Sequence, residues 1–244
     1  MQDFLSQGLI FSNLSGMDST TRLIVTVLCY LATIICAYLL GSLNFAIIIS
    51  DKQYRQDIRD FGSKNAGMTN MMRTYGKKAA GLTLLGDALK AMISCLIGYA
   101  LLGQMGAYIA GLFCIIGHMF PIYYRFKGGK GVVTAAVTIL MCNPFVFLIL
   151  FVMFAIIVLI SKYISLGSVM CMLLYPIILD RIDRFFYGGA PYVWCAALMT
   201  LLVVVKHWEN IKRLSQGKES KFSFKKSVKA PTTETTEATN EEKE

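Results

Sequence analysis

The sequence is poor in charge: charged residues make up 16% of its 244 positions, apolar residues make up 55%, and the mean hydropathy is +0.56. Globular domains carry about 25% charged residues, so an ordinary soluble domain is excluded. The seven cysteines include no C-x-x-C pair and lie in or at the ends of apolar segments, so the sequence offers neither a zinc motif nor a disulfide framework. The composition indicates an integral membrane protein, with the cysteines as small apolar packing residues.

Long uncharged segments are what the sequence has instead. Residues 23–49 contain no charged side chain, and about 20 apolar residues suffice to cross a bilayer as a helix. Further apolar segments follow at 79–102, 106–124, 131–142, 144–160, 164–179 and 190–205. The sequence therefore predicts an all-α integral membrane fold, a bundle of seven transmembrane helices, with a tight turn at Asn143-Pro144 because proline cannot continue the preceding helix. The short fourth segment leaves counts of six and five open.

The basic residues fall on one side of this predicted bundle. Arginine and lysine concentrate in 51–78, in 125–130, at Lys162 and from 206 onward, whereas the alternate loops contain only Arg22, Arg181 and Arg184. Basic loops are cytoplasmic, which predicts the N-terminus outside and the C-terminus in the cytoplasm. Anionic lipid and phosphorylated substrate then explain the net charge of +9, and no nucleic-acid partner is expected.

The domain organisation predicted from composition is simple. Residues 1–22 form an extracytoplasmic N-terminal extension, residues 23–217 form one seven-span domain, and residues 218–244 are a polar, Thr/Glu-rich cytoplasmic tail. Such a tail cannot bury enough apolar surface to fold, so we expect it to be disordered. No internal repeat is evident.

The first cytoplasmic loop contains a glycine-rich motif at residues 61–73, the first motif, which reads FGSKNAGMTNMMR. Glycines permit tight turns that direct backbone N–H groups at an anion, and hydroxyl and amide side chains add neutral donors. Arg73 could complete a phosphate cradle by bidentate pairing. A flexible polar loop with an arginine at the membrane surface is the alternative, and this motif alone does not decide between them.

The second motif, at residues 117–134, has the core Lys127-Gly-Gly-Lys130-Gly followed by an apolar segment. Two cations around a glycine turn at a helix N-terminus suit a phosphate. The spacing does not fit a Walker A loop, since glycine stands at 131 where Ser or Thr is required, so a nucleotide site is disfavoured. Two lysines of a positive-inside loop are the alternative.

The third motif, at residues 205–214, places His207, Glu209, Asn210 and Arg213 after the last apolar segment. His207 and Asn210 are three residues apart and so share one helical face. An amphipathic helix end with a basic stop-transfer run is the alternative. The chain has only two histidines, His118 and His207, and each lies in one of these motifs, which favours a single polar, basic site at one membrane face.

Together these motifs resemble those of the bacterial acyl-phosphate glycerol 3-phosphate acyltransferase family, PlsY. The first resembles G-S-x-N-x-G-A-T-N-x-x-R, the second G-H-x-F-P-x-x-x-x-F-K-G-G-K-G-V-A-T, and the third H-x-E-N-I-x-R-L. The similarity covers roughly residues 35–220. Met68 replaces the usual alanine of the first motif, and Trp208 replaces a residue that is commonly basic in the third.

The resemblance implies transfer of an acyl group from acyl phosphate to the 1-hydroxyl of sn-glycerol 3-phosphate, giving lysophosphatidate and phosphate, at the cytoplasmic face of the bacterial inner membrane. Positioning two phosphates and stabilising an oxyanion would be the main tasks. The sequence singles out no covalent nucleophile, so a phosphate oxygen of the donor, or His118, is left to accept the hydroxyl proton. No cofactor, metal or obligate protein partner is expected, and membrane lipids surround the enzyme.

On this hypothesis Ser63, Arg73 and His207 hold the acyl-phosphate head, with Ser165 as a further candidate, and Lys127, Lys130 and Asn210 hold glycerol 3-phosphate. The catalytic residues are Ser63, Arg73, Lys130, His207 and Asn210. The substrate-binding residues are Asn65, Thr69, Asn70, His118, Lys127, Gly128, Gly129, Ser165 and Glu209.

Two rival functions remain: a membrane transporter of a phosphorylated or anionic metabolite, and a lipid-binding scaffold without catalysis. Transporters more often show repeated halves and charges near the midplane. Asp87 and Lys90 lie within a predicted span, where ionisable residues are costly. Their spacing of three also fits a simple ion pair within one helix.

Overall fold

The computed structural model describes Gly8, Gly16 and residues 18–222, and this part of the chain contains helices and no strand. The helices are α2 (Ser19–Ser42), α3 (Phe45–Tyr54), η2 (Ile58–Asp60), α4 (Met68–Thr74), α5 (Lys77–Met119), η3 (Ile122–Tyr124), α6 (Val132–Cys142), α7 (Pro144–Ser161), α8 (Ile164–Tyr187), α9 (Val193–Lys206) and α10 (Trp208–Ser215). Most of the expected N-terminal extension and residues 223–244 of the expected tail lie outside the described residues.

Each apolar segment of the sequence coincides with a helix or part of one. Four helical runs are long and apolar enough to cross a bilayer: Ser19–Tyr54, Lys77–Tyr124, Pro144–Ser161 and Ile164–Tyr187. Two shorter apolar helices are Val132–Cys142 and Val193–Lys206. The prediction of an all-helical fold is confirmed for the described chain, whereas the count of seven spans and the orientation of the termini stay predictions.

Helix α5 contains two of the expected spans. Leu102 (φ −133°, ψ 17°) and Gly103 (φ 62°, ψ −149°) leave the helical conformation and separate an arm before them from an arm after them. The arms pack so closely that a Cβ added at Gly98 would collide with the carbonyl of Gly106. The break between the segments 79–102 and 106–124 is therefore a tight reversal inside one long helical run.

The predicted turn at Asn143-Pro144 is confirmed. Asn143 ends α6 and caps α7: its Oδ1 accepts a hydrogen bond from the Val146 N–H at 3.1 Å, and Pro144 occupies the first helical position. Proline is favoured there because its missing N–H would have no partner in the helix. The Asn143 Nδ2 also donates to Asp183 Oδ1 of α8, at 3.1 Å, which ties the turn to the neighbouring helix.

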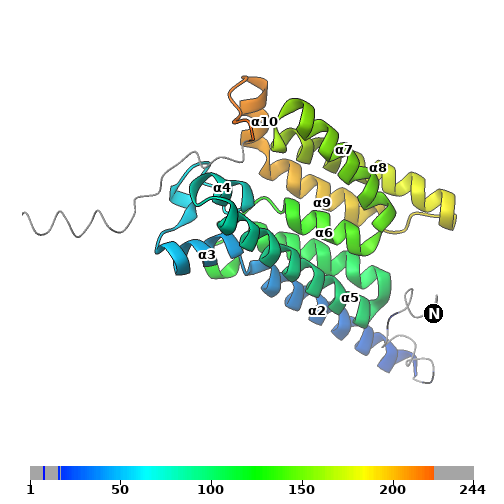
Figure 1. The fold of residues 1–244 in the computed structure, drawn as a ribbon. Coiled ribbons are helices and arrows are strands. Elements are labelled where there is room, and N and C mark those ends of the chain that lie inside the picture. Colours follow the sequence, from blue (N-terminus) through cyan, green and yellow to red (C-terminus); the bar gives the residue numbers. More distant parts are fainter. Residues whose placement is uncertain (1–7, 9–15, 17, 223–244) are drawn as a thin grey trace, which may run out of the picture. The chain divides into compact units, whose positions relative to one another are not determined.

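The described chain forms two compact units, one from residues up to Asn44 together with Gly86–Phe222, and one from Phe45–Leu85. In the larger unit α6 packs on α7, α7 on α8, and α8 on α9, as Figure 1 shows. Its core consists of large, fully buried side chains, among them Tyr108, Ile115, Met119, Tyr175, Leu179, Met199 and Val203.

Helix α7 shows why this unit belongs in a lipid environment. Only Val146 and Leu150 of its side chains are buried, while Phe151, Leu159 and Ile160 are exposed. Exposing apolar surface to water costs about 25 cal/mol per Å², and a helix of this composition avoids that cost in the hydrocarbon core of a bilayer.

The smaller unit is a short helical assembly around a polar loop. Ile58 and Met71 are fully buried, and the rings of Tyr54 and Tyr75 stack with centroids 3.9 Å apart. Asp57 begins η2 by accepting from the Arg59 N–H at 2.9 Å, and hydrogen bonds from Arg59 lower the pKa of Asp57. These contacts give the residues before the first motif a defined shape.

Candidate active site

The second motif forms a compact loop after α5. The Gly128 N–H donates to the Met119 carbonyl at 3.2 Å, and the Gly129 N–H donates to the His118 carbonyl at 3.1 Å. A side chain at position 128 would collide with the His118 carbonyl, so the close approach requires glycine. Both amides bond to the chain itself, which means that their role in this structure is to shape the loop, while Arg125, Lys127 and Lys130 carry its charge.

Lys130 connects the second motif to the third. It lies just before α6 and its Nζ donates to Asn210 Oδ1 of α10. Asn210 Nδ2 donates in turn to Glu219 Oε1 at 2.6 Å, and Ser165 Oγ of α8 donates to the same oxygen at 2.8 Å. The Arg213 Nε donates to Glu219 Oε2 at 2.8 Å. We call these five residues the anion array; it holds three of the residues predicted from sequence.

His207 lies at the junction of α9 and α10, and its side chain is 3% exposed. Its Nδ1 lies 2.8 Å from the Val203 carbonyl, which can only accept, so Nδ1 carries the hydrogen and Nε2 of the neutral ring is an acceptor. Burial, helped by the charge of Lys130, lowers the pKa of His207 to about 4. A neutral imidazole in this orientation has no N–H left for a phosphate.

The neighbours of His207 differ in exposure. Asn210 is buried, as expected for a residue on the same helical face as His207, whereas Glu209 and Trp208 are exposed. A further contact joins the second and third motifs, because the Lys206 Nζ lies 4.1 Å from the centroid of the Phe120 ring. Such a contact contributes roughly 0.5–1 kcal/mol when exposed.

His118 belongs to a separate buried cluster. The Lys90 Nζ lies 2.8 Å from Asp87 Oδ1, 2.8 Å from His118 Nδ1 and 2.7 Å from the Leu43 carbonyl. An ammonium group only donates, so Nδ1 of His118 accepts from Lys90 and cannot also take a proton from a substrate. The ion pair that the sequence offered as one interpretation of Asp87 and Lys90 is present, and it fixes His118 and the C-terminal end of α2.

In the smaller unit, Asn70 organises the first motif. Its Oδ1 accepts from the Ser63 N–H at 2.9 Å, and its Nδ2 lies 2.9, 3.1 and 3.2 Å from the carbonyls of Phe61, Asn65 and Ile58. Asn70 is 1% exposed. Its amide is occupied by the backbone, so it shapes the loop, although the sequence placed it among the substrate-binding residues.

The other residues of the first motif differ in conformation and exposure. Gly62 has φ +57°, and a Cβ there would collide with Asn70 Oδ1, which explains the glycine. Ser63 is exposed, Asn65 and Thr69 are half-buried, and the half-buried Arg73 lies in the last turn of α4. Met68, the departure from the usual alanine, begins α4 and is half-buried, so the loop accommodates the larger side chain.

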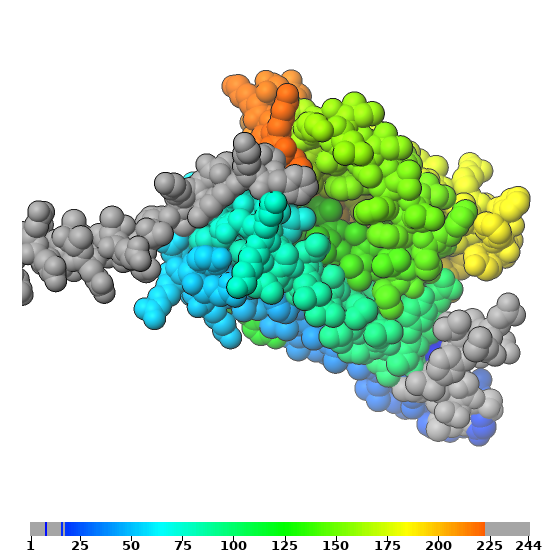
Figure 2. Space-filling view, viewed as in Figure 1, coloured from blue at the N-terminus to red at the C-terminus, as the bar shows by residue number. Residues whose placement is uncertain are grey.

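Two residues of the anion array were not among the predicted site residues: Arg213, which the sequence named only as part of the third motif, and Glu219, which lies in none of the motifs. Glu219 lies in the segment from 218 onward that composition assigned to a tail, yet its side chain is only 8% exposed. The only local signal is one acidic residue between Lys218 and Lys221. Figure 2 shows the orange residues around and after α10 against the yellow-green end of α7 and start of α8.

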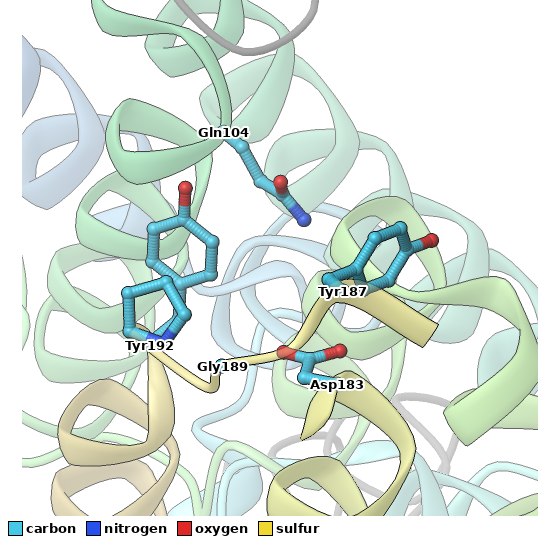
Figure 3. A pocket seen from close by; sticks show the side chains of 6 residues that line it. Gln104, Asp183, Tyr187, Gly189 and Tyr192 are labelled. Carbon is cyan, nitrogen blue, oxygen red and sulfur yellow. The ribbon is translucent and has the colours of Figure 1, made fainter. Parts of the chain in front are cut away.

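The larger unit also contains a cavity of about 240 Å³ (Figure 3). It is lined by Gln104, Asp183, Tyr187, Gly189, Pro191 and Tyr192. None of these residues belongs to the three motifs or to the anion array.

Comparison with known proteins decides the family. Residues 31–217 match the family described as glycerol-3-phosphate acyltransferase. The chain belongs to this glycerol-3-phosphate acyltransferase family. A curated relative of that name from Finegoldia magna is 44% identical over 78% of this chain and 93% of its own length. Another from Thermoanaerobacter pseudethanolicus is 36% identical over 81% of this chain and 98% of its own length.

Solved structures agree with this assignment. PlsY, an integral membrane glycerol 3-phosphate acyltransferase, in its glycerol 3-phosphate form matches with a TM-score of 0.72 and 35% identity over 80% of this chain and 96% of that one. Its lysophosphatidic acid form matches with a TM-score of 0.69 and 33% identity, again over 80% of this chain and 96% of that one. The resemblance identified from the three motifs is confirmed: this chain is a membrane acyltransferase of the PlsY family.

Proposed function

We propose that the protein transfers an acyl group from acyl phosphate to the 1-hydroxyl of sn-glycerol 3-phosphate, the first acylation step of phospholipid biosynthesis. The observation that carries the proposal is the contact between Lys130 and Asn210, which joins the second and third motifs into one cationic, hydrogen-bonding array. The forms in which PlsY was solved, with glycerol 3-phosphate and with lysophosphatidic acid, fit the acceptor and the product.

We assign the residues of the three motifs to the two phosphate groups of the substrates. Lys127, Lys130 and Asn210 hold the phosphate of glycerol 3-phosphate. Ser165, which the sequence placed at the acyl-phosphate head, donates to the same Glu219 oxygen as Asn210, so we reassign it to the glycerol 3-phosphate side. Ser63 and Arg73 of the first motif hold the acyl-phosphate head. Preorganised donors aimed at developing negative charge contribute to catalysis because they need no reorganisation during the reaction.

The proton balance requires an acceptor for the hydroxyl hydrogen. The glycerol oxygen forms a bond to the acyl carbon, the bond from that carbon to the phosphate oxygen breaks, and phosphate leaves with the electron pair. His207 presents a neutral Nε2, so we assign it to accept a hydrogen bond from the 1-hydroxyl and withdraw its expected role at the acyl-phosphate head. The proton ends on the released phosphate.

The proposed location is the cytoplasmic face of the bacterial inner membrane, with seven spans and the N-terminus outside. The support is the distribution of arginine and lysine, which puts the loops of all three motifs on the basic side. Both substrates are anionic, and a basic face concentrates them.

Turnover by the purified protein tests the proposal. Labelled glycerol 3-phosphate is supplied with palmitoyl phosphate or with palmitoyl-CoA, and lysophosphatidate is measured. Product from the acyl phosphate alone, lost in Arg73→Ala and retained in Lys52→Ala, supports the donor and the phosphate cradle; Lys52 is an exposed cation of the same unit. Absence of product from both donors, with uptake of glycerol 3-phosphate into vesicles, would instead favour the transporter.

A further inference from the structure

The carboxylate of Glu219 lies two residues beyond the segment that matches the family, which ends at 217, and completes the anion array. It accepts three hydrogen bonds, from Ser165 Oγ and Asn210 Nδ2 on one oxygen and from Arg213 Nε on the other. Its side chain is almost wholly buried at a place where the surrounding groups are donors. A buried carboxylate with three donors is a fixed part of the array, because an ionised group is costly to bury without partners.

The chemical consequence falls on Asn210. Its amide has a donor end and an acceptor end, and Lys130 donates to Oδ1 while Glu219 accepts from Nδ2. A rotation of the amide by half a turn would put Nδ2 against the ammonium and Oδ1 against the carboxylate, which are two repulsive pairs. Glu219 and Lys130 therefore select one orientation of Asn210, and Asn210 in turn holds the ammonium of Lys130 in place.

We propose that Glu219 is a positioning residue for acyl transfer: through Asn210 and Ser165 it sets the orientation in which Lys130 and Asn210 receive the phosphate of glycerol 3-phosphate. This inference rests on the proposed function. Glu219 does not touch the substrate; it acts through groups that do.

Glu219 is ionised under the conditions of the reaction. Burial alone would raise the pKa of Glu219, but hydrogen bonds from Arg213, Asn210 and Ser165 lower it below its usual value. Charge-assisted hydrogen bonds are about twice as strong as neutral ones. The negative charge also balances Arg213 and Lys130, which leaves the array less cationic than its lysine and arginine alone would make it.

The segment around Glu219 is held independently of its carboxylate. The Lys218 N–H donates to the Arg213 carbonyl at 2.8 Å, and the Phe222 N–H donates to the Lys162 carbonyl at 2.7 Å. These backbone bonds anchor both ends of residues 218–222. Substitution of the carboxylate should therefore change the orientation of Asn210 without releasing the segment.

The contrary interpretation is that Glu219 occupies the place of a substrate phosphate and must be displaced before binding. The two accounts predict opposite results. A positioning residue is required for turnover, so its removal lowers the rate. An internal competitor opposes binding, so its removal lowers KM for one of the phosphate substrates and raises the rate at low substrate concentration.

The test measures kcat and KM for both substrates with the full chain, with palmitoyl phosphate as donor. We expect Glu219→Ala to lower kcat/KM for glycerol 3-phosphate by about 10- to 100-fold, the loss that follows when a hydrogen bond to a charged group is removed. KM for palmitoyl phosphate should stay within about twofold. Glu219→Gln, which keeps one acceptor oxygen for Asn210, should recover part of the rate. Lys221→Ala, an exposed neighbour, is the matched control and should behave as the wild type.

A double-mutant cycle separates positioning from a general structural role. If Glu219 acts through Asn210, then Glu219→Ala should add little in an Asn210→Ala background. Additive losses, wild-type kinetics of both Glu219 variants, or faster turnover would each overturn the inference while leaving the proposed function intact. A folded wild-type protein that forms no lysophosphatidate would overturn both. Should Glu219→Ala fail to fold, Glu219→Gln and the cycle built on it decide.

Discussion

The two units each contain a polar assembly organised by an asparagine, and the two assemblies differ in what that asparagine holds. Among the described residues, the side chain of Asn70 bonds to four backbone groups, so it fixes the shape of a loop. Asn210 lies between an ammonium and a carboxylate, so it fixes the direction of charged side chains. On the proposed function, the same residue type therefore serves folding in the smaller unit and acyl transfer in the larger one. The partners of the two side chains differ, whereas the residue type is the same.

The largest expected effect is the loss of activity when the anion array loses its lysine. Lys130→Ala should lower kcat/KM by about 100- to 1,000-fold, because a preorganised charge at the reacting phosphate is lost. The melting temperature in detergent should change little. Lys212→Ala, which removes an exposed lysine of α10, is the control. Equal activity of the two variants would show that the array does not carry the reaction.

A second prediction concerns the buried cluster that holds His118. Lys90→Met should destabilise the protein by about 3–5 kcal/mol, because it leaves Asp87 as an unpaired buried charge. The double variant Asp87→Leu with Lys90→Met should recover much of this loss. Thermal unfolding measures both. A double variant that is less stable than Lys90→Met would contradict the view that the unpaired charge is the cause.

The third prediction concerns Asn70 and tests the comparison between the two asparagines most directly. Asn70→Ala leaves buried carbonyls without a donor, at a cost of about 1–3 kcal/mol for each unsatisfied group, and should lower the melting temperature. Asn210→Ala should lower the rate with a smaller change in melting temperature. If the two variants exchanged these phenotypes, the distinction between a folding asparagine and a functional one would be wrong.

The fourth prediction is the pH dependence of stability that His207 causes. The pKa of His207 is lowered from the usual value of 6.5 to about 4 in the folded protein. Between these two pH values the unfolded chain binds a proton at His207 and the folded chain does not. The stability contributed by neutral His207 is therefore complete above pH 6.5 and is lost as the pH falls towards 4.

Melting temperatures measured from pH 8 to pH 4.5 check this sign. The wild type should lose more stability on acidification than His207→Gln does. The pH profile of wild-type turnover should contain no ionisation near pH 6.5 that is absent from the profile of His207→Gln. A steeper loss in His207→Gln than in the wild type would contradict the assignment of a neutral, buried imidazole.

How far the sequence predicts this molecule depends on whether the signal is local. The helices and the turn at Asn143 follow from apolar runs and from proline, and the family follows from three motifs. The pairing of Lys130 with Asn210 links residues 80 positions apart, and the sequence indicated it only through the shared chemistry of two motifs. The reversal at Gly103 lies inside α5, where the sequence predicts two separate spans, 79–102 and 106–124.

Other features depend on contacts that the sequence pattern does not show. Asn70 is a hub because carbonyls of residues 58, 61 and 65 converge on it, which depends on the path of the loop. Glu219 lies in a polar stretch whose composition is typical of disorder, and its burial depends on Ser165 and Arg213 lying nearby in space. The orientation of the His207 ring follows from a carbonyl one turn earlier in the chain.

The most direct test of the account is lysophosphatidate formation by the purified chain from palmitoyl phosphate and glycerol 3-phosphate, compared between wild type, Lys130→Ala and Lys212→Ala. Product should form in the wild type and in Lys212→Ala, and it should be almost absent in a folded Lys130→Ala. Wild-type product formation by Lys130→Ala, or formation from palmitoyl-CoA alone, would contradict it.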